Sequence, residues 1–226
     1  MVLSMNKRIV VISGFSGAGK GTLVRQLLEL NRKAPVDSKL WLSVSDTTRP
    51  PRSDGGDNYN FISAEEYNDR TANGFYLEHN EYGNYGYGTP IKPVLAALEN
   101  GNIVLLEIDY NGMVQVRDYF RNRDVSVTTV FISTEGNELF NRLYKRGDLP
   151  GEIKKRLTAA RSEATHVGEY DCLINNGDLK DAAHYLWSVV TREADFVRNS
   201  FDSLLFIEQV DSVLRSFEYI GSAEEA

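Results

Sequence analysis

The chain reads Gly14-Phe15-Ser16-Gly17-Ala18-Gly19-Lys20-Gly21-Thr22 directly after the apolar run Ile9-Val10-Val11-Ile12. A segment with leucines at helical spacing, Leu23 and Leu27, follows it. Glycines let such a loop turn tightly and leave room for an anion against bare backbone. Between a strand and a helix, the loop N–H groups and the positive end of the helix dipole bind phosphate, and Lys20 adds a charge for the β- and γ-phosphates. The stretch therefore predicts a phosphate-binding loop rather than a glycine turn without function.

The loop departs from the usual pattern at one position. A Ser or Thr commonly follows the lysine, whereas here Gly21 follows it and Thr22 comes next. Thr22 is therefore the candidate ligand for Mg²⁺, although the shift by one residue leaves a direct bond open.

Composition excludes several classes of protein. The chain has 226 residues, a formal net charge of -7 and a single cysteine, Cys172. One cysteine allows no internal disulfide and suits a reducing compartment, so we expect a cytoplasmic protein. The acidic balance argues against a nucleic-acid partner, and no apolar run is long enough for a membrane span. The segment before Arg8 lacks the apolar stretch of a signal peptide, and Met5 is an alternative start.

Further along the chain, strands and helices alternate. Gly21 to about Asn31 should form a helix that ends at Ala34-Pro35, and Leu40–Val44 reads as a second strand. The order of elements predicts an α/β fold with a central parallel sheet and a binding site at the carboxyl ends of its strands. Residues 43–90 are polar, glycine-rich and aromatic, and Ser63 opens a helix there with Glu66 at capping-box spacing.

Several motifs occur together in one order. They are Ser43-Val44-Ser45-Asp46-Thr47-Thr48-Arg49-Pro50-Pro51-Arg52, Tyr59-Asn60-Phe61, Leu77-Glu78, Tyr87-Gly88-Thr89, Leu105-Leu106-Glu107-Ile108-Asp109-Tyr110-Asn111-Gly112, Leu139-Phe140-Asn141-Arg142-Leu143-Tyr144-Lys145-Arg146-Gly147, Lys155-Arg156-Leu157 and Tyr170-Asp171-Cys172-Leu173-Ile174-Asn175-Asn176. From about Arg8 to about Asp195, this series resembles the guanylate kinases.

The resemblance implies a three-layer P-loop fold with a central parallel sheet, an inserted lobe that binds a nucleoside monophosphate, and a short lid. The core would comprise residues 1–42 and 91–195, with the lid at about 142–156. Residues 43–90 would form the GMP-binding lobe, and 196–226 a C-terminal helical extension.

The resemblance also implies ATP as phosphoryl donor, with Mg²⁺. The expected ATP-binding residues are Gly14, Phe15, Ser16, Gly17, Ala18, Gly19, Lys20, Gly21, Thr22 and Asn175. The expected catalytic residues are Lys20, Arg49, Arg142, Arg146 and Arg156, because phosphoryl transfer needs spreading negative charge to be neutralised. Ordinary helix-surface charge is the alternative for the arginines of the lid. Arg161 lies at a further helical spacing and is a weaker candidate, and neither His79 nor His166 is expected to be catalytic.

For the acceptor, the resemblance places GMP against Ser45, Arg49, Arg52, Tyr59, Glu78, Tyr87, Thr89, Glu107 and Asp109. Arginine forks and tyrosine hydroxyls suit the phosphate, and a bidentate carboxylate at Glu78 suits the two adjacent donors of guanine. Asp109 would join Thr22 at the metal through water. The alternatives are a solvated arginine pair, a helix-surface charge at Glu78, and a structural ion pair for Glu107 and Asp109.

Three departures from the family pattern stand out. Phe15 occupies the position of a usual proline, and the lid between Arg146 and Arg156 is slightly short. The link from Arg52 to Tyr59 is also shortened, so Asp54 is the nearest substitute for an acidic residue of the family there.

The predicted activity is the conversion of ATP and GMP (and dGMP) to ADP and GDP in purine nucleotide metabolism, by a monomer or homodimer without nucleic-acid or membrane partners. Two alternatives remain open. The first is a scaffold module that binds phosphoproteins, against which the intact Lys20 argues. The second is a ribose bisphosphate kinase, against which the expected base-binding residues Ser45, Glu78 and Thr89 argue.

Past Asp195, Ser200 should cap a helix with an apolar stripe, which would pack on the core or form a dimer contact. The stripe comprises Phe201, Leu204, Leu205, Val213, Leu214 and Phe217.

Overall fold

The computed structural model describes residues 7–34, 39–51, 58–191 and 202–224, with side chains up to residue 217. The predictions for Met5, Arg52, Asp54 and Ser200 lie outside these ranges. The chain divides into two compact units: unit 1 comprises Met1–Val11 and Ala34–Thr128, and unit 2 comprises Ile12–Lys33 and Thr129–Ala226.

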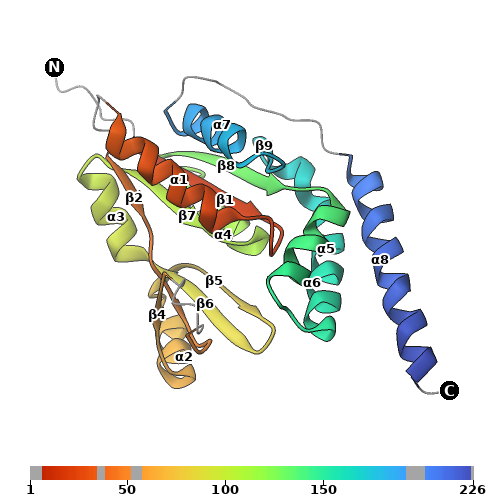
Figure 1. The fold of residues 1–226 in the computed structure, drawn as a ribbon. Coiled ribbons are helices and arrows are strands. Elements are labelled where there is room, and N and C mark those ends of the chain that lie inside the picture. The colour runs from red at the N-terminus through yellow and green to blue at the C-terminus, as the bar shows by residue number, and fades with distance from the viewer. Residues whose placement is uncertain (1–6, 35–38, 52–57, 192–201, 225–226) are drawn as a thin grey trace. The chain divides into compact units, whose positions relative to one another are not determined.

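The larger sheet of the described residues has five strands (Figure 1). Its order is β2-β7-β1-β8-β9, with β1 at Arg8–Gly14, β2 at Leu40–Leu42, β7 at Ile103–Glu107, β8 at Ser126–Ser133 and β9 at Cys172–Asn175. β2 pairs in parallel with β7, and β8 pairs in parallel with β9. Residues 8–13 of β1 are buried, as expected for a strand covered on both faces. The predicted α/β class with a central parallel sheet is confirmed.

Unit 1 also contains a second sheet, with the order β4-β3-β6-β5. The strands are β3 at Ser45–Thr47, β4 at Tyr59–Phe61, β5 at Tyr76–Tyr82 and β6 at Tyr85–Pro90. Helix α2 (Ala64–Ala72) belongs to this lobe, and its predicted cap is present: the Ser63 hydroxyl accepts a hydrogen bond from the N–H of Glu66 at 3.1 Å. The predicted strand Leu40–Val44 is shorter than expected, because β2 ends at Leu42 and β3 begins at Ser45 in the other sheet.

The remaining helices divide between the two units. Unit 1 has α3 (Ile91–Glu99) and α4 (Tyr110–Phe120); unit 2 has α1 (Lys20–Lys33), α5 (Gly136–Lys145), α6 (Pro150–Glu163), the short 3₁₀ helix η1 (Ala164–Glu169), α7 (Leu179–Thr191) and α8 (Ser203–Glu224). Leu23 and Leu27 of α1 are fully buried, as the helical spacing predicts. Within the described part of the chain, no helix combines the length and the apolar character that a bilayer span requires.

The C-terminal helix α8 has a described cap, and it buries a different face from the predicted stripe. Asp202 provides the described cap, since its carboxylate accepts hydrogen bonds from the N–H groups of Leu204 and Leu205 at 3.0 Å each. Of the predicted apolar stripe, Leu204 and Leu205 do not pack on the core, because they are 72% and 50% exposed, whereas Phe206 is 2% exposed. Three consecutive apolar residues fit more than one helix face, and packing against α5 and α6 selects the face that carries Phe206.

Candidate active site

The loop between β1 and α1 has the backbone that a phosphate-binding loop needs. Gly14, Gly17 and Gly19 have positive φ angles of 150°, 100° and 89°. At Gly14 only glycine fits, because a Cβ atom would lie 2.2 Å from the carbonyl oxygen of Ile132. The N–H of Ala18 donates to the carbonyl of Phe15 at 3.0 Å, which closes the turn. The remaining loop residues, Ser16 and Gly21, belong to the same segment, with Gly21 already in α1.

Lys20 is the first residue of α1 and bends back over the loop. Its Nζ donates to the carbonyl oxygen of Gly14 at 2.7 Å and to that of Phe15 at 3.2 Å. An ammonium that rests on loop carbonyls lies where a phosphate cradled by the loop would meet it. The geometry therefore suits the predicted role of Lys20.

Arg142 braces this loop from α5. Its guanidinium donates to the carbonyl oxygens of Ala18 at 3.1 Å and Asn176 at 2.7 Å, and its Nε bonds Glu138 at 2.9 Å. Asn176 is 4% exposed, and its amide also donates to Ala18 at 2.7 Å. The residue predicted from the sequence is the neighbouring Asn175, whose buried Oδ1 has no hydrogen-bond partner among the described residues. Asn176 was missed because two adjacent asparagines at a strand end look alike in sequence.

Asp148 connects the other two predicted arginines of the lid. Arg146 donates from Nε to Asp148 Oδ1 at 2.8 Å, and Arg156 Nε lies 3.1 Å from Asp148 Oδ2. Arg156 also donates to the Ser16 hydroxyl of the loop. Asp148 was not predicted as part of the site. Its position two residues after Arg146 was the one sequence feature that indicated an ion pair with that arginine. Arg161 instead pairs with Asp211 of α8 at 2.7 Å.

The Phe15 side chain does not belong to the ligand-facing part of the loop. It is fully buried, with its ring 4.3 Å from that of Phe206 and 4.9 Å from that of Phe131, measured between centroids. Of the predicted ATP-binding residues, Phe15 therefore has only its backbone available to a ligand.

Unit 1 brings together a second group, made of Ser45, Glu78 and Thr89. Thr89 lies opposite Glu78 in the β5–β6 ladder and donates to Glu78 Oε1 at 2.5 Å, and the hydroxyls of Thr89 and Ser45 are 2.9 Å apart. All three residues are buried: Ser45 is 8% exposed, Glu78 is 4% exposed and Thr89 is 1% exposed. Glu78 is therefore a buried strand residue, which rules out the alternative of a helix-surface charge.

The electrostatics of Glu78 follow from this environment. Burial raises the pKa of its carboxyl to about 7, and the hydrogen bond from Thr89 lowers the pKa only in part, while the nearby charge of Asp109 raises it further. Gly112 is needed beside it, because a Cβ atom at this position would lie 2.5 Å from Glu78 Oε2. A carboxylate held in this way can accept two hydrogen bonds from a planar ligand edge.

Asp109 caps α4, with Oδ1 accepting from the N–H of Gly112 at 2.8 Å and Oδ2 from the amide of Asn80 at 2.5 Å. Asn80 was missed by the sequence analysis, although it alternates with Glu78 along β5 and so shares its face. Glu107 is the last residue of β7 and is half-buried. The described contacts thus give Asp109 a capping role in addition to the predicted binding role.

A third group suits an anion. The guanidinium of Arg49 lies 5.8 Å from the ring centroid of Tyr59, and the rings of Tyr59 and Tyr87 are 5.8 Å apart. These three predicted phosphate ligands are therefore neighbours in unit 1. The partner arginine, Arg52, lies outside the described residues.

Asp46 holds the lobe together and was not predicted as important. It is 0% exposed, accepts from Asn60 and from the Tyr76 hydroxyl at 3.0 Å each, and pairs with Arg70. Its partners come from β4, β5 and α2, so this carboxylate ties β3 to the rest of the lobe. Ser45 precedes it directly, which links this network to the group of Ser45, Glu78 and Thr89.

Comparison with known proteins identifies the family of the chain. The guanylate kinase family model matches residues 6–193. The guanylate kinase of Clostridium tetani is 35% identical over 205 residues, covering 89% of this chain and 93% of the relative, and that of Streptomyces kasugaensis is 39% identical over 191 residues, covering 83% and 88%. The crystal structure of guanylate kinase from Anaplasma phagocytophilum superposes with a TM-score of 0.65 at 28% identity, covering 82% of this chain and 85% of that one. The chain belongs to the guanylate kinase family.

Proposed function

We propose that this protein is a guanylate kinase, which transfers the γ-phosphoryl group of ATP to the α-phosphate of GMP or dGMP and releases ADP and GDP or dGDP. The observation that carries the proposal is the buried set of Ser45, Glu78 and Thr89, found in a chain that also has a complete phosphate loop. Buried polar groups with few partners of their own are what a base-reading site requires.

The donor half uses the loop and its braces. The loop N–H groups would hold the β-phosphate, and Lys20 would leave the carbonyls of Gly14 and Phe15 for the β- and γ-phosphates. Arg146 and Arg156 would leave Asp148 and pair instead with the transferred phosphoryl group. Their planar guanidinium groups would neutralise the charge on its equatorial oxygens. Arg142 would keep the loop carbonyl of Ala18 turned away from the anion.

The acceptor half positions GMP. Arg49, Tyr59 and Tyr87 would bind the α-phosphate, with Arg52 as the expected fourth ligand. Glu78 would accept from guanine N1–H and from its N2 amine, while the hydroxyls of Ser45 and Thr89 address the ring edge and O6. Attack by a phosphate oxygen needs no protein base, so positioning and charge neutralisation are the whole task.

The residues present fit Mg²⁺ as the accompanying ion. Mg²⁺ takes oxygen ligands and keeps several waters, so phosphates and few protein groups suffice. The Thr22 hydroxyl, on the first turn of α1, accepts from Arg25 at 3.2 Å and retains a lone pair. Both carboxylate oxygens of Asp109 already accept protein hydrogen bonds, which suits a role through water. When bound, the ion would neutralise charge between the β- and γ-phosphates.

The compartment and assembly are also part of the proposal. The single, buried Cys172 suits a reducing compartment such as the cytoplasm. We propose a monomer or homodimer that acts on small-molecule substrates in purine nucleotide metabolism.

A coupled assay of ADP release tests the proposal, with ATP and Mg²⁺ as donor and with GMP, AMP, CMP or UMP as acceptor. We expect rapid ADP release with GMP and rates near background with the other three. Lys20→Met is the control for contaminating kinases, because its rate with GMP should also fall to background. A scaffold module would release no ADP with any nucleotide, and either that result or a preference for another base would contradict the proposal.

A further inference from the structure

Helix α8 lies beyond the family match, which ends at residue 193, yet it packs directly against the phosphate loop's own side chain. Phe206 of α8 and Phe15 of the loop stack with centroids 4.3 Å apart and ring planes 6° from parallel. Phe15 is also the position where this chain departs from the proline that is usual in the family. The two departures from the family pattern are therefore in contact with each other.

The stacked pair belongs to a buried aromatic cluster of unit 2. Phe15, Phe131 and Phe206 are 0%, 2% and 2% exposed. The rings of Phe131 and Phe15 are arranged edge to face with centroids 4.9 Å apart, and the ring centroids of Tyr170 and Phe131 are 5.0 Å apart. Aromatic rings in stacked and edge-to-face arrangements favour particular orientations as well as burial. This cluster therefore restrains the direction in which the Phe15 side chain leaves the loop.

A restraint on Phe15 is also a restraint on the anion-binding backbone. The Phe15 carbonyl accepts from the N–H of Ala18 at 3.0 Å and from Lys20 Nζ at 3.2 Å. The packed ring anchors the Phe15 Cα atom, and a shift of the backbone at this residue would alter both hydrogen bonds. Phe206 therefore contacts the residue whose carbonyl oxygen accepts a hydrogen bond from the ammonium group of Lys20.

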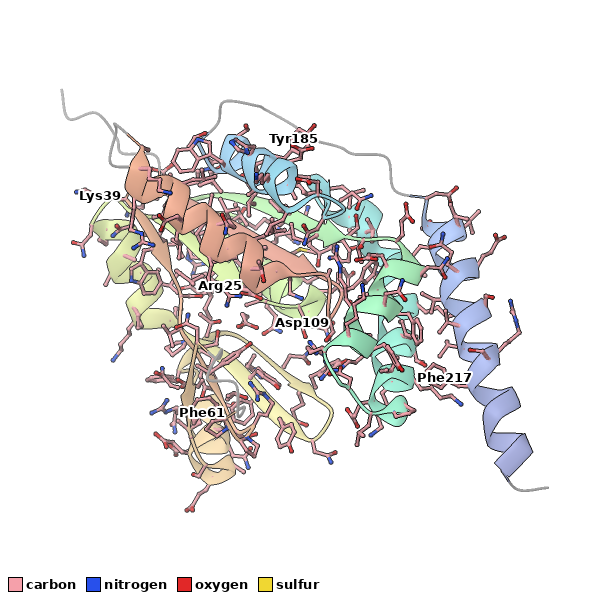
Figure 2. All side chains as sticks on the ribbon, viewed as in Figure 1. Arg25, Lys39, Phe61, Asp109, Tyr185 and Phe217 are labelled. Atoms are coloured by element: carbon pink, nitrogen blue, oxygen red, sulfur yellow. The ribbon has the colours of Figure 1, made fainter. Side chains whose placement is uncertain are left out.

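A second connection runs from α8 to the same loop. Gln209 Oε1 accepts from the N–H of Gly136 at 2.8 Å, which satisfies one of the free donors at the start of α5. The same helix carries Arg142, which donates to the Ala18 carbonyl. Farther along α8, the ring of Phe217, which is labelled in Figure 2, has its centroid 6.2 Å from that of Phe140 in α5. Helix α8 therefore supports both the loop and the helix that braces it.

We propose that α8 is a positioning element of the donor half, in which Phe206 acts through Phe15 to hold the phosphate loop in its anion-binding conformation. The proposal rests on the proposed function, because it takes the loop's ligand to be ATP. Its consequence is specific: loss of the Phe206 ring weakens ATP binding and leaves GMP binding unchanged, since the GMP-binding residues belong to unit 1.

Binding measurements by titration calorimetry test this on the full chain, with ATP and with GMP separately. The variants are Phe206→Ala, Phe206→Leu (which fills most of the volume without a ring) and Leu204→Ala. Leu204 is the matched control because it lies on the same helix and is 72% exposed. We expect Phe206→Ala to raise the Kd for ATP about tenfold, Phe206→Leu to raise it by a smaller factor, and both to leave the Kd for GMP within about twofold of wild type. Leu204→Ala should change neither constant.

A double-mutant cycle separates positioning from general destabilisation. Phe15→Ala and Phe206→Ala together should cost no more ATP affinity than Phe15→Ala alone, because Phe206 acts only through that ring. An unchanged Kd for ATP in Phe206→Leu, or equal losses of affinity for ATP and GMP, would overturn the proposal. Wild-type protein that binds ATP but not GMP would overturn the guanylate kinase assignment and still leave the ATP constants to decide the role of Phe206, whereas wild-type protein that does not bind ATP would overturn both.

Discussion

Thr89 Oγ1 donates a hydrogen bond of 2.5 Å to Oε1 of Glu78, the residue opposite it in the β5–β6 ladder. The hydroxyl thereby orients a carboxylate that the surrounding protein would otherwise disfavour, since Glu78 is 4% exposed. Ser45 extends the same chain of hydroxyls. The proposed recognition of guanine by Glu78 depends on this hydrogen bond.

The rate with GMP should depend on the ionisation of Glu78. Burial raises the pKa of Glu78 to about 7, so the carboxylate that accepts both guanine donors is lost as the pH falls through this value. We therefore expect kcat/KM for GMP to be level above about pH 8 and to fall about tenfold per pH unit well below 7. The profile should be measured from pH 5.5 to 9.

Glu78→Gln is the control for that profile. The GMP phosphate also titrates near pH 6, and the variant keeps that titration while it lacks the carboxyl. A variant whose profile matches that of the wild type would show that another group causes the pH dependence.

Lys20→Met should abolish most turnover while the protein stays folded. A methionine side chain has a similar length but cannot neutralise the charge that develops on the phosphates, so kcat should fall by about 10²–10³ or more. The two hydrogen bonds from Lys20 to the loop would be lost, at a cost of about 1 kcal/mol each in stability. Circular dichroism together with steady-state kinetics checks both parts, and a folded variant with near-normal kcat would remove Lys20 from the mechanism.

Arg156→Ala should lower kcat, whereas its neighbour offers a matched control. Arg156 contacts the loop through Ser16 and is 24% exposed in its side chain, while Lys155 is 77% exposed and pairs with Glu152. We expect Arg156→Ala to reduce kcat by about 10²-fold or more and Lys155→Ala to remain within about twofold of wild type. Equal kcat values in the two variants would argue that these lid arginines are only surface charges.

The buried carboxylate of Asp46 should matter for stability. Removing it in Asp46→Ala leaves Arg70, Tyr76 and Asn60 without their shared acceptor, which should cost about 3 kcal/mol in the free energy of unfolding. Asp118→Ala is the control, because its pair with Arg121 is exposed and should be worth less than about 1 kcal/mol. Urea unfolding of both variants measures the difference, and similar losses would show that burial of the network is unimportant.

The sequence predicts the fold and most of the candidate site because the chemistry there is local. The glycines, Lys20 and the strand before them form one continuous segment, and Glu78, Thr89, Ser45, Arg49 and Tyr59 each belong to a short motif. The structure brings Glu78, Thr89 and Ser45 into one hydrogen-bonded chain, which the order of motifs alone does not specify.

What the sequence did not show depends on contacts between distant segments. Asn176 and Asp148 are polar residues beside predicted ones. Asn176 is distinguished by its hydrogen bond to the loop carbonyl of Ala18, and Asp148 by the approach of Arg156 from α6. The partner of Phe15 lies in α8, beyond the family resemblance, so no motif could indicate it. The inward face of α8 was ambiguous for the same reason, because three adjacent apolar residues fit several faces.

The central claim is that Glu78 reads guanine, and base selectivity tests it most directly. The measurement is kcat/KM for GMP, IMP and AMP with the wild type and with Glu78→Gln. Adenine offers an acceptor at N1 and no N2 amine, so the wild type should prefer GMP over AMP by about 10⁴-fold, with IMP between them. Glu78→Gln should narrow the ratio of GMP to AMP by weakening GMP, because an amide presents an NH₂ group to a donor. A ratio that Glu78→Gln leaves unchanged would contradict the account.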